Sequence, residues 1–174
     1  MQYRRFGKLD VQVSALGFGC MRLPTRGKYE DIDEPEATRM IHYAIDHGVN
    51  YIDTAYPYHG GNSEKFLGQA LQNGYRDRIK LATKLPCWQI QAYQDFDRIL
   101  NEQLARLRAE HIDFYLLHSL NQDSWTKVYN LDVLNWAESA IADGRIGHLG
   151  FSFHDKYDVF QQIVDAYNRW TFCQ

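Results

Sequence analysis

The chain has 174 residues, of which 45% are hydrophobic and 24% are charged, and its formal net charge is −3. This composition is typical of a globular protein with one sizeable core. The mild acidity and the lack of a Lys/Arg cluster exclude a general attraction to nucleic acid or to anionic membranes. No apolar run is long enough to span a membrane, and the first residues lack the apolar core of a signal peptide. We therefore expect a cytoplasmic protein with no membrane or nucleic-acid partner.

The chain has three cysteines, Cys20, Cys87 and Cys173, which lie far apart in the sequence. An odd number at these spacings encodes neither a disulfide framework nor a metal site of the CxxC type. Each is expected to be a small buried or loop thiol, and we predict no metal site.

The predicted elements begin with a hairpin and continue as short apolar runs that alternate with amphipathic stretches. Residues 3–6 and 11–15 form the hairpin around a turn at residues 7–10, and a strand follows at residues 16–20. Residues 36–47 have apolar positions that recur every three or four residues, which predicts a helix; Pro35 suits its start.

The same alternation continues to the last residue of the chain. Strands are predicted where short β-branched and aromatic runs occur, and helices where the apolar period is close to 3.6. The expected strands cover residues 51–53, 79–83, 112–117, 148–153 and, from 171 onward, the start of another; the expected helices cover residues 63–72, 95–108, 133–143 and 156–170.

Strands that alternate with helices of 10 to 15 residues indicate βαβ units and a parallel sheet, so the fold class is α/β. The predicted strands begin about 31 residues apart, the size of one βα unit, whereas a complete eight-unit barrel needs roughly 250 residues. We therefore predict a partial (β/α)8 TIM-type barrel: an N-terminal hairpin, five βα units and the start of a sixth strand. Residues 1–174 are interpreted as a single domain, the N-terminal part of a barrel that stops inside a strand.

The run Gly-Phe-Gly-Cys-Met-Arg at residues 17–22 suggests a dinucleotide-binding fingerprint, but Arg22 stands where the third glycine is required. No helix is predicted to open there either, because Pro24 and a polar loop follow. We favour a glycine-rich strand end that lets a ligand approach the backbone.

Four chemically active residues follow predicted strands: Asp53, Tyr58, Lys84 and His118. Taken singly, Asp53 is explained as a turn former, Tyr58 as a surface aromatic residue, Lys84 as a solvated charge and His118 as a strand-end histidine. Taken together, they occupy the carboxyl ends of successive parallel strands, which is where barrel enzymes carry their active sites. An unpaired ammonium at the end of a buried strand is costly, and a pair between Asp53 and Lys84 would account for it.

This set of side chains suits proton donation to a carbonyl oxygen. A tyrosine has an unperturbed pKa near 10, and a nearby Lys84 ammonium is expected to lower the pKa of Tyr58 so that it acts as a general acid. Asp53 would hold Lys84 charged, and His118 would orient the substrate carbonyl or share in proton transfer. No side chain supplies hydride, so a nicotinamide cofactor is implied.

The sequence resembles the aldo-keto reductase superfamily, whose members are soluble (β/α)8-barrel enzymes that use NADP(H) to interconvert carbonyls and alcohols. The resemblance covers the whole chain, and several motifs in order make it specific. The motifs are the leading hairpin, Leu-Gly-Phe-Gly-Cys-Met-Arg-Leu-Pro at 16–24, Tyr-Ile-Asp-Thr-Ala-Tyr-Pro-Tyr at 51–58, Asn-Ser-Glu-Lys-Phe-Leu-Gly at 62–68, Leu-Ala-Thr-Lys at 81–84, Ile-Asp-Phe-Tyr-Leu-Leu-His at 112–118 and Gly-Arg-Ile-Gly-His-Leu-Gly-Phe-Ser at 144–152.

The resemblance implies NADP(H)-dependent reduction of an aldehyde or ketone in the full-length protein, with the family's catalytic tetrad on Asp53, Tyr58, Lys84 and His118. It also implies which residues bind the cofactor. These are Gly19, Cys20 and Met21 along the cofactor, Asp53, Ser152 at the carboxamide, and Gln174 after the sixth strand.

The chain departs from the family in two respects. The family often follows the carboxamide-binding serine with asparagine, whereas Phe153 and His154 follow Ser152 here. The family binds the cofactor's phosphates with loops after strands seven and eight, which lie beyond Gln174. The motif at residues 16–24 also resembles a bacterial branch that often carries a C-terminal iron–sulfur segment, and no iron–sulfur motif occurs within the 174 residues.

Two alternatives to an enzyme remain open: a regulatory barrel module that binds a partner or cofactor without turnover, and a truncated half-barrel that no longer binds cofactor. We also expect self-association through the open edges of such a barrel. If the chain is an enzyme, its partner is a small carbonyl compound that is selected by the loops at residues 26–34, 86–92 and 119–127. An aromatic-lined pocket is expected from Tyr56, Trp88, Trp125 and Phe153.

Overall fold

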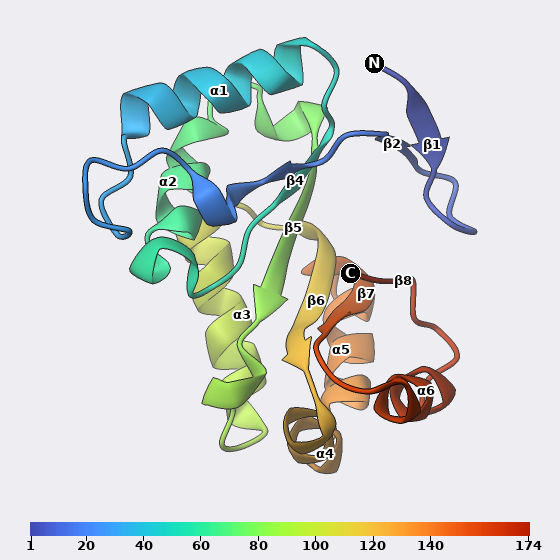
Figure 1. Ribbon diagram of the computed structural model, residues 1–174. Coiled ribbons are helices and arrows are strands. Elements are labelled where there is room, and N and C mark those ends of the chain that lie inside the picture. Colours follow the sequence, from blue (N-terminus) through green and yellow to red (C-terminus); the bar gives the residue numbers. More distant parts are fainter.

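The computed structural model describes residues 1–174, and its centre is a six-stranded parallel sheet. Strands that follow one another in the sequence are neighbours in the sheet, and helices pack along its outer side, so the structure is the predicted partial (β/α) barrel (Figure 1). In sheet order the strands are β3 (Phe18–Gly19), β4 (Tyr51–Asp53), β5 (Lys80–Leu85), β6 (Ile112–Leu120), β7 (Ile146–Phe153) and β8 (Phe172–Cys173).

Six helices accompany the strands, and each turns an apolar stripe toward the sheet. In α3, for example, Phe96, Ile99 and Leu100 are fully buried at the helical spacing of three and four residues. The helices are α1 (Glu34–Asp46), α2 (Ser63–Ala70), α3 (Gln94–Leu107), α4 (Gln122–Asn130), α5 (Val133–Ala142) and α6 (Tyr157–Asp165); short 3-10 helices occur at η1 (Cys20–Arg22), η2 (Tyr58–Gly61), η3 (Arg76–Arg78) and η4 (Cys87–Gln89).

The strands divide the apolar side chains between two cores because successive residues point to opposite faces. Residues such as Leu81, Tyr115 and Leu117 belong to the main core of 36 buried residues that the sheet shares with the helices. Their neighbours Ala82, Phe114 and Leu116 form a second cluster on the opposite, inner face of the sheet.

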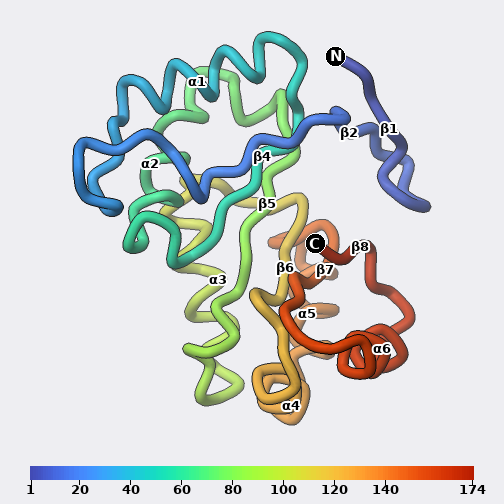
Figure 2. The backbone as a smooth tube through the Cα atoms, viewed as in Figure 1, coloured from blue at the N-terminus to red at the C-terminus, as the bar shows by residue number.

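The N-terminal hairpin covers this inner cluster. Strands β1 (Tyr3–Arg5) and β2 (Gln12–Ser14) pair antiparallel, as predicted, and Phe6 in the connection packs against Phe114 and Phe172 with ring centroids 4.8 and 5.2 Å apart. The hairpin thereby fills one part of the barrel interior with aromatic side chains. The backbone trace in Figure 2 ends at β8, where the C-terminus lies beside β7.

The largest difference from the prediction is α4, which occupies most of a segment that the sequence analysis treats as a loop, residues 119–127. Strand β6 continues to Leu120, and α4 begins directly afterwards with a capping box: the Asn121 side chain accepts from the Ser124 N–H, and the Ser124 hydroxyl accepts from the Asn121 N–H. Figure 1 places α4 beyond the carboxyl end of β6.

Other predicted boundaries were wrong by a few residues. The last helix ends at Asp165 instead of residue 170, because the chain turns so that Trp170 packs on Phe151, with ring centroids 4.9 Å apart. Strand β7 begins at Ile146, two residues early, where Ile146 pairs with Ile112. The first barrel strand stops at Gly19, and Cys20 already belongs to η1.

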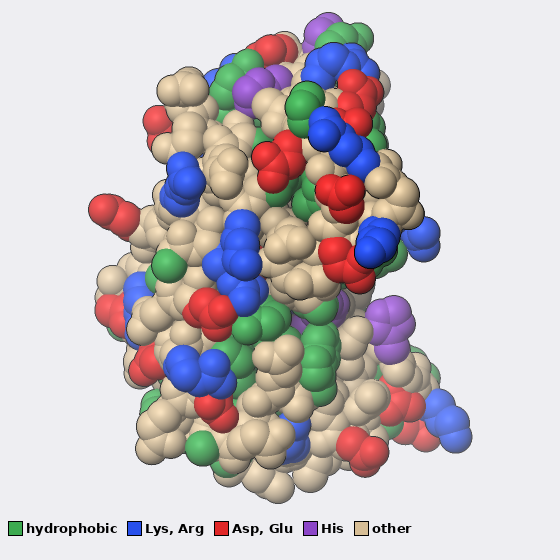
Figure 3. Space-filling view, turned by 90° about the vertical axis from the view of Figure 1, so that its left-hand side faces the viewer, with side chains coloured by type: hydrophobic (Ala, Val, Ile, Leu, Met, Phe, Trp, Pro, Cys, Tyr) green, Lys and Arg blue, Asp and Glu red, His purple; other side chains and the backbone are tan.

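The helix-covered side shown in Figure 3 carries Lys/Arg and Asp/Glu side chains interspersed, so no large field of one sign develops on it. None of the helices combines the length and the apolar character that a bilayer-spanning segment needs.

Candidate active site

The parallel register places three of the four predicted site residues at one end of the sheet, and Tyr58 follows β4 in η2. Asp53 ends β4 and lies opposite Ala82, two residues before Lys84 in β5. Lys84 in turn lies opposite Leu116, two residues before His118 in β6. Residues two apart in a strand point to the same face of the sheet, so these side chains all project into the barrel interior near the carboxyl ends of the strands.

Lys84 is the centre of the cluster. Its side chain is 2% exposed, and its ammonium donates to Asp53 Oδ1 at 2.6 Å, to the Thr54 carbonyl at 2.9 Å and to the Tyr58 hydroxyl at 3.3 Å. All three ammonium protons therefore have acceptors, which is what a buried charge requires. The predicted pair between Asp53 and Lys84 is present, and Tyr58 is attached to it.

The Asp53–Lys84 pair is almost completely buried, and burial opposes both charges. It raises the pKa of Asp53 and lowers the pKa of Lys84, while the charge of each partner acts in the opposite direction. Gln174 also acts to lower the pKa of Asp53, in the direction that favours the carboxylate. The geometry, with a 2.6 Å contact, argues for an ion pair.

The expected effect of Lys84 on Tyr58 is wrong in direction. Burial, followed by the Asp53 carboxylate, raises the pKa of Tyr58 to about 12. The main cause is burial, which disfavours the charged phenolate, and the negative charge of Asp53 acts in the same direction. Tyr58 therefore holds its proton throughout the physiological pH range and is available as a neutral donor.

His118 lies on the other side of Tyr58, with the two rings 5.9 Å apart in an edge-on arrangement. It is 9% exposed, and burial, Lys84 and His154 together lower its pKa to about 3, so the imidazole is neutral near pH 7. Its Nδ1 is the one buried side-chain polar atom in the structure without a hydrogen-bond partner. Such an atom at the mouth of a barrel is a natural contact for a polar ligand.

The residues predicted to bind cofactor occupy the same rim. A Cβ added at Gly19 would meet nothing within 4 Å, so its backbone is open to a ligand, and Met21 is 42% exposed. The Cys20 side chain, by contrast, is fully buried in the main core, which leaves only its backbone to face a ligand. Ser152 is buried, and its hydroxyl oxygen accepts from the Ser119 N–H at 2.7 Å, so its own proton remains to be donated.

These features fit a nicotinamide ring. Gly19 offers open space beside the backbone, Ser152 offers a hydroxyl donor for a carboxamide oxygen, and the orphan Nδ1 of His118 offers a polar contact nearby. The structure contains no group of three or more His, Cys, Asp or Glu side chains that is arranged to hold a metal ion.

The predicted aromatic pocket is largely wrong, because only Trp88 lies against the site, with its ring 5.2 Å from that of His118. The other three face away from the barrel interior. Tyr56 lies under the Arg106 guanidinium and donates to Glu102, Trp125 is 5% exposed within the core, and Phe153 packs on Phe160. Phe153 follows the inward-pointing Ser152, so the alternation of the strand directs it outward.

Sequence reasoning missed the polar network that supports Lys84 from behind. Glu64 is fully buried and accepts from Thr83 at 2.7 Å and from Gln103 at 2.6 Å, and Gln103 also donates to the Lys84 carbonyl at 3.1 Å. Arg106 neutralises Glu64 from the helix side. The sequence carried one signal of this network, because Glu64 lies in the otherwise apolar face of α2. A carboxylate that is buried there needs hydrogen-bond or charged partners, so such a network could have been predicted.

The chain is similar to known proteins in both sequence and fold. The family model described as "Aldo/keto reductase family" matches residues 15–174. The chain is 31% identical over 157 residues to a probable aldo-keto reductase 1 from Glycine max, with 85% of this chain and 44% of that protein covered. It is 30% identical over 162 residues to a 6-dehydroglucose reductase from Novosphingobium aromaticivorans, with 86% and 51% covered.

Among solved structures, the holo form of an aldo-keto reductase from Bacillus halodurans superposes with a TM-score of 0.78 at 30% identity, covering 98% of this chain and 55% of that one. The chain thus spans about half the length of the relatives it matches. Because the family model covers nearly the whole chain, this protein belongs to the aldo/keto reductase family.

Proposed function

We propose that the full-length protein reduces an aldehyde or ketone to the alcohol with NADP(H), and that Tyr58 is the general acid. The observation that carries the proposal is the Lys84 ammonium, which bonds both the Asp53 carboxylate and the Tyr58 hydroxyl at the carboxyl end of the sheet. A structural ion pair alone does not need a half-buried phenol as its third partner.

Each residue has a definite task in this proposal. Tyr58 donates its proton to the carbonyl oxygen as that oxygen gains negative charge, and its raised pKa keeps the proton in place until then. His118 is a neutral imidazole that donates a hydrogen bond to the same oxygen and so orients the carbonyl. Lys84, held in place by Asp53, positions the Tyr58 hydroxyl, and its ammonium donates a hydrogen bond to the phenolate that remains.

The nicotinamide supplies the hydride when it is bound. Gly19 and Met21 would lie along it through their backbone, and Ser152 and Gln174 would hold the carboxamide. The choice of NADP(H) over NAD(H) rests on the resemblance to the family. A small-molecule carbonyl substrate would enter past Trp88, the aromatic side chain that borders His118.

The decisive experiment replaces Tyr58 with phenylalanine. Loss of the hydroxyl should lower kcat for carbonyl reduction by about 100-fold or more, the scale of a positioned acid, while the Kd for NADPH stays the same. Tyr157→Phe on α6 is the matched control, because Tyr157 is 72% exposed, and it should leave the rate unchanged.

Undiminished reduction by the Tyr58→Phe variant would remove Tyr58 from the mechanism. NADPH binding by the unmodified protein without any turnover, over a panel of aldehydes and ketones, would instead favour the non-enzymatic alternative.

A further inference from the structure

A histidine that the proposed mechanism does not use, His59, directly follows Tyr58 and is fully buried. Its backbone has φ of 53° and ψ of 44°, the left-handed conformation that non-glycine residues rarely adopt. Gly60 and Gly61 continue with positive φ, so the chain turns sharply immediately after the proposed proton donor. A residue held in this conformation must be fixed by its surroundings.

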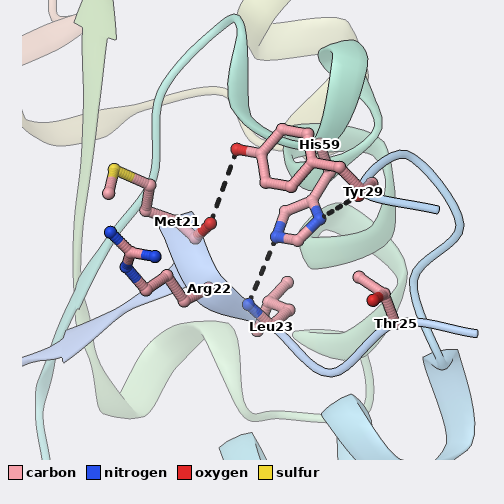
Figure 4. A pocket seen from close by; sticks show the side chains of 6 residues that line it. All are labelled: Met21, Arg22, Leu23, Thr25, Tyr29 and His59. Carbon is pink, nitrogen blue, oxygen red and sulfur yellow. Dashed lines mark hydrogen bonds between the residues drawn. The ribbon is translucent and has the colours of Figure 1, made fainter. Parts of the chain in front are cut away.

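The surroundings of His59 belong to the segment after β3, residues 20–32. Its Nε2 accepts from the Leu23 N–H at 3.2 Å, and its Nδ1 lies 2.6 Å from the Tyr29 carbonyl oxygen, as Figure 4 shows. A carbonyl only accepts and an N–H only donates, so the two bonds together require a neutral imidazole with its proton on Nδ1. The Tyr29 ring also stacks on His59, with centroids 4.5 Å apart.

The neighbouring residues continue this contact. Asn62 donates to the Glu30 carbonyl at 3.1 Å, and the Glu30 side chain lies so close to Gly60 that a Cβ there would meet it at 2.6 Å. Beside them, His59 and Tyr29 line a cavity of about 420 Å³ together with Met21 and Arg22. The turn that carries Tyr58 is therefore fastened to the loop that carries Met21.

The Tyr58 side chain itself is held weakly. Its hydroxyl receives one long bond of 3.3 Å from the Lys84 ammonium, which also lies 5.0 Å from the centroid of the Tyr58 ring, and the ring meets His118 edge-on at 5.9 Å. A shift of 1 Å in the backbone at residue 58 would break the Lys84 contact. The position of the hydroxyl thus depends on the backbone on either side of it, and on the C-terminal side that backbone is anchored by His59.

We propose that His59, as the neutral Nδ1–H tautomer, is the positioning residue for Tyr58: it fastens the Tyr58 turn to the backbone of residues 23 and 29 and so sets the distance from the phenol to Lys84. The proposal rests on the proposed function for its kinetic consequences. Its hydrogen bonds belong to the fold and are testable without any activity.

The first experiment is spectroscopic. Two-bond ¹H–¹⁵N correlation spectra of the ¹⁵N-labelled protein near pH 7.5 should show His59 as a neutral ring with a protonated Nδ1 and an unprotonated Nε2. Assignment comes from the signal lost in the His59→Asn variant. An Nε2–H tautomer or a cationic ring would overturn the proposal even if the protein proved to have no reductase activity.

The second experiment is a double-mutant cycle. His59→Ala should lower kcat by about 10- to 100-fold, the effect of a misplacement of about 1 Å, with the Kd for NADPH within about threefold. In a Tyr58→Phe background the same substitution should change the residual rate by less than about threefold, because its effect passes through the missing hydroxyl. If His59→Ala lowered the rate by the same factor with Tyr58 and with Phe at position 58, His59 would support only the overall fold and the proposal would be wrong.

Conservative variants separate the two bonds. Asn tolerates the left-handed conformation and places an amide donor where Nδ1 lies, so His59→Asn should recover part of the rate that His59→Ala loses. Gly also tolerates this conformation but restores neither hydrogen bond, so His59→Gly should not recover the rate. Asn73→Ala is the matched control, since Asn73 has φ of 59° in an exposed turn and should leave the rate unchanged. Full activity in His59→Gly would also overturn the proposal.

Discussion

Burial of the phenol keeps the proton on Tyr58, and this has a direct kinetic consequence. The pKa of about 12 means that the phenol is protonated at any pH near neutrality, so it is always ready to donate and almost never ready to accept. Burial, the leading cause of this shift, outweighs the single long contact with Lys84.

We therefore expect the two directions of the reaction to differ in their pH dependence. Reduction, which needs the neutral phenol, should show no loss attributable to Tyr58 between pH 6 and 9. Alcohol oxidation, which needs the phenolate, should rise by about tenfold per pH unit over the same range. Steady-state rates in both directions across this range provide the measurement. A reduction rate that declines with a midpoint between pH 7 and 9 would contradict the raised pKa.

His118 links the site to the stability of the fold. Its folded-state pKa of about 3 lies below the unfolded value of 6.5, so the unfolded chain takes up a proton first as the pH falls. The stability contribution is complete above pH 6.5 and is lost as the pH falls toward about 3.

Between pH 7 and 4.5, the free energy of unfolding should therefore fall by about 2–3 kcal/mol more in the unmodified protein than in His118→Gln. Urea unfolding at several pH values would measure the difference. His47→Gln, at an exposed histidine beyond α1, is the control and should retain the full pH dependence. Parallel pH curves for the unmodified protein and His118→Gln would show that His118 takes up its proton normally when folded.

At the scale of elements, α2 and the end of α3 pack closely at Gly68. A Cβ on Gly68 would lie 2.3 Å from the Arg106 carbonyl oxygen and 2.7 Å from the Leu107 carbonyl carbon, both backbone atoms that cannot rotate away. This contact matters for the site because α2 also carries Glu64 and α3 carries Gln103, the buried pair behind Lys84.

Gly68→Ala should consequently destabilise the protein by about 2–3 kcal/mol through overpacking, although alanine favours helices. Gly19→Ala is the matched comparison: a Cβ there meets nothing, so the melting temperature should stay the same while the affinity for NADPH falls. Thermal unfolding with and without NADPH measures both effects. An unchanged melting temperature for Gly68→Ala would mean that the two helices separate freely.

For the molecule as a whole, the sheet has two edges, since β3 and β8 each pair on one side only. Beside β3 lies an apolar surface with a cavity of about 450 Å³, which we term the β3–α1 surface; it includes Met1, Leu16, Phe18, Met40 and Tyr43. Leu16 is 62% exposed and Tyr43 is 61% exposed, a concentration of apolar area that monomers rarely leave in water.

We expect a polypeptide of these 174 residues to self-associate through the β3–α1 surface at micromolar concentration, because an unpaired strand and an apolar patch lie together. Leu16→Glu combined with Tyr43→Glu should shift the mass measured by light scattering toward the monomer. Tyr157→Glu, at an exposed tyrosine on α6, should leave the mass unchanged. A monodisperse monomer before any substitution would rule this surface out.

The sequence by itself determined the order of elements and the end of the sheet at which the chemistry lies. Hydrophobic periodicity distinguishes strands from helices locally, and parallel strands must align their carboxyl ends, so the sequence alone predicts that Asp53, Lys84 and His118 meet. The ion pair followed from the cost of burying a lone ammonium.

Three features were decided only by the tertiary structure. The pKa of Tyr58 is raised, the side chains of Tyr56, Trp125 and Phe153 point away from the barrel interior, and the His59 ring makes two hydrogen bonds to the backbone. Each depends on what surrounds a side chain in three dimensions. A pKa is set by burial together with all nearby charges, and the direction in which a ring points is set by strand register and packing. Local sequence patterns contain only the spacing of residues along the chain. Contacts such as that between His59 and Leu23 join residues 36 positions apart, and such distances are fixed only when the whole sheet has formed.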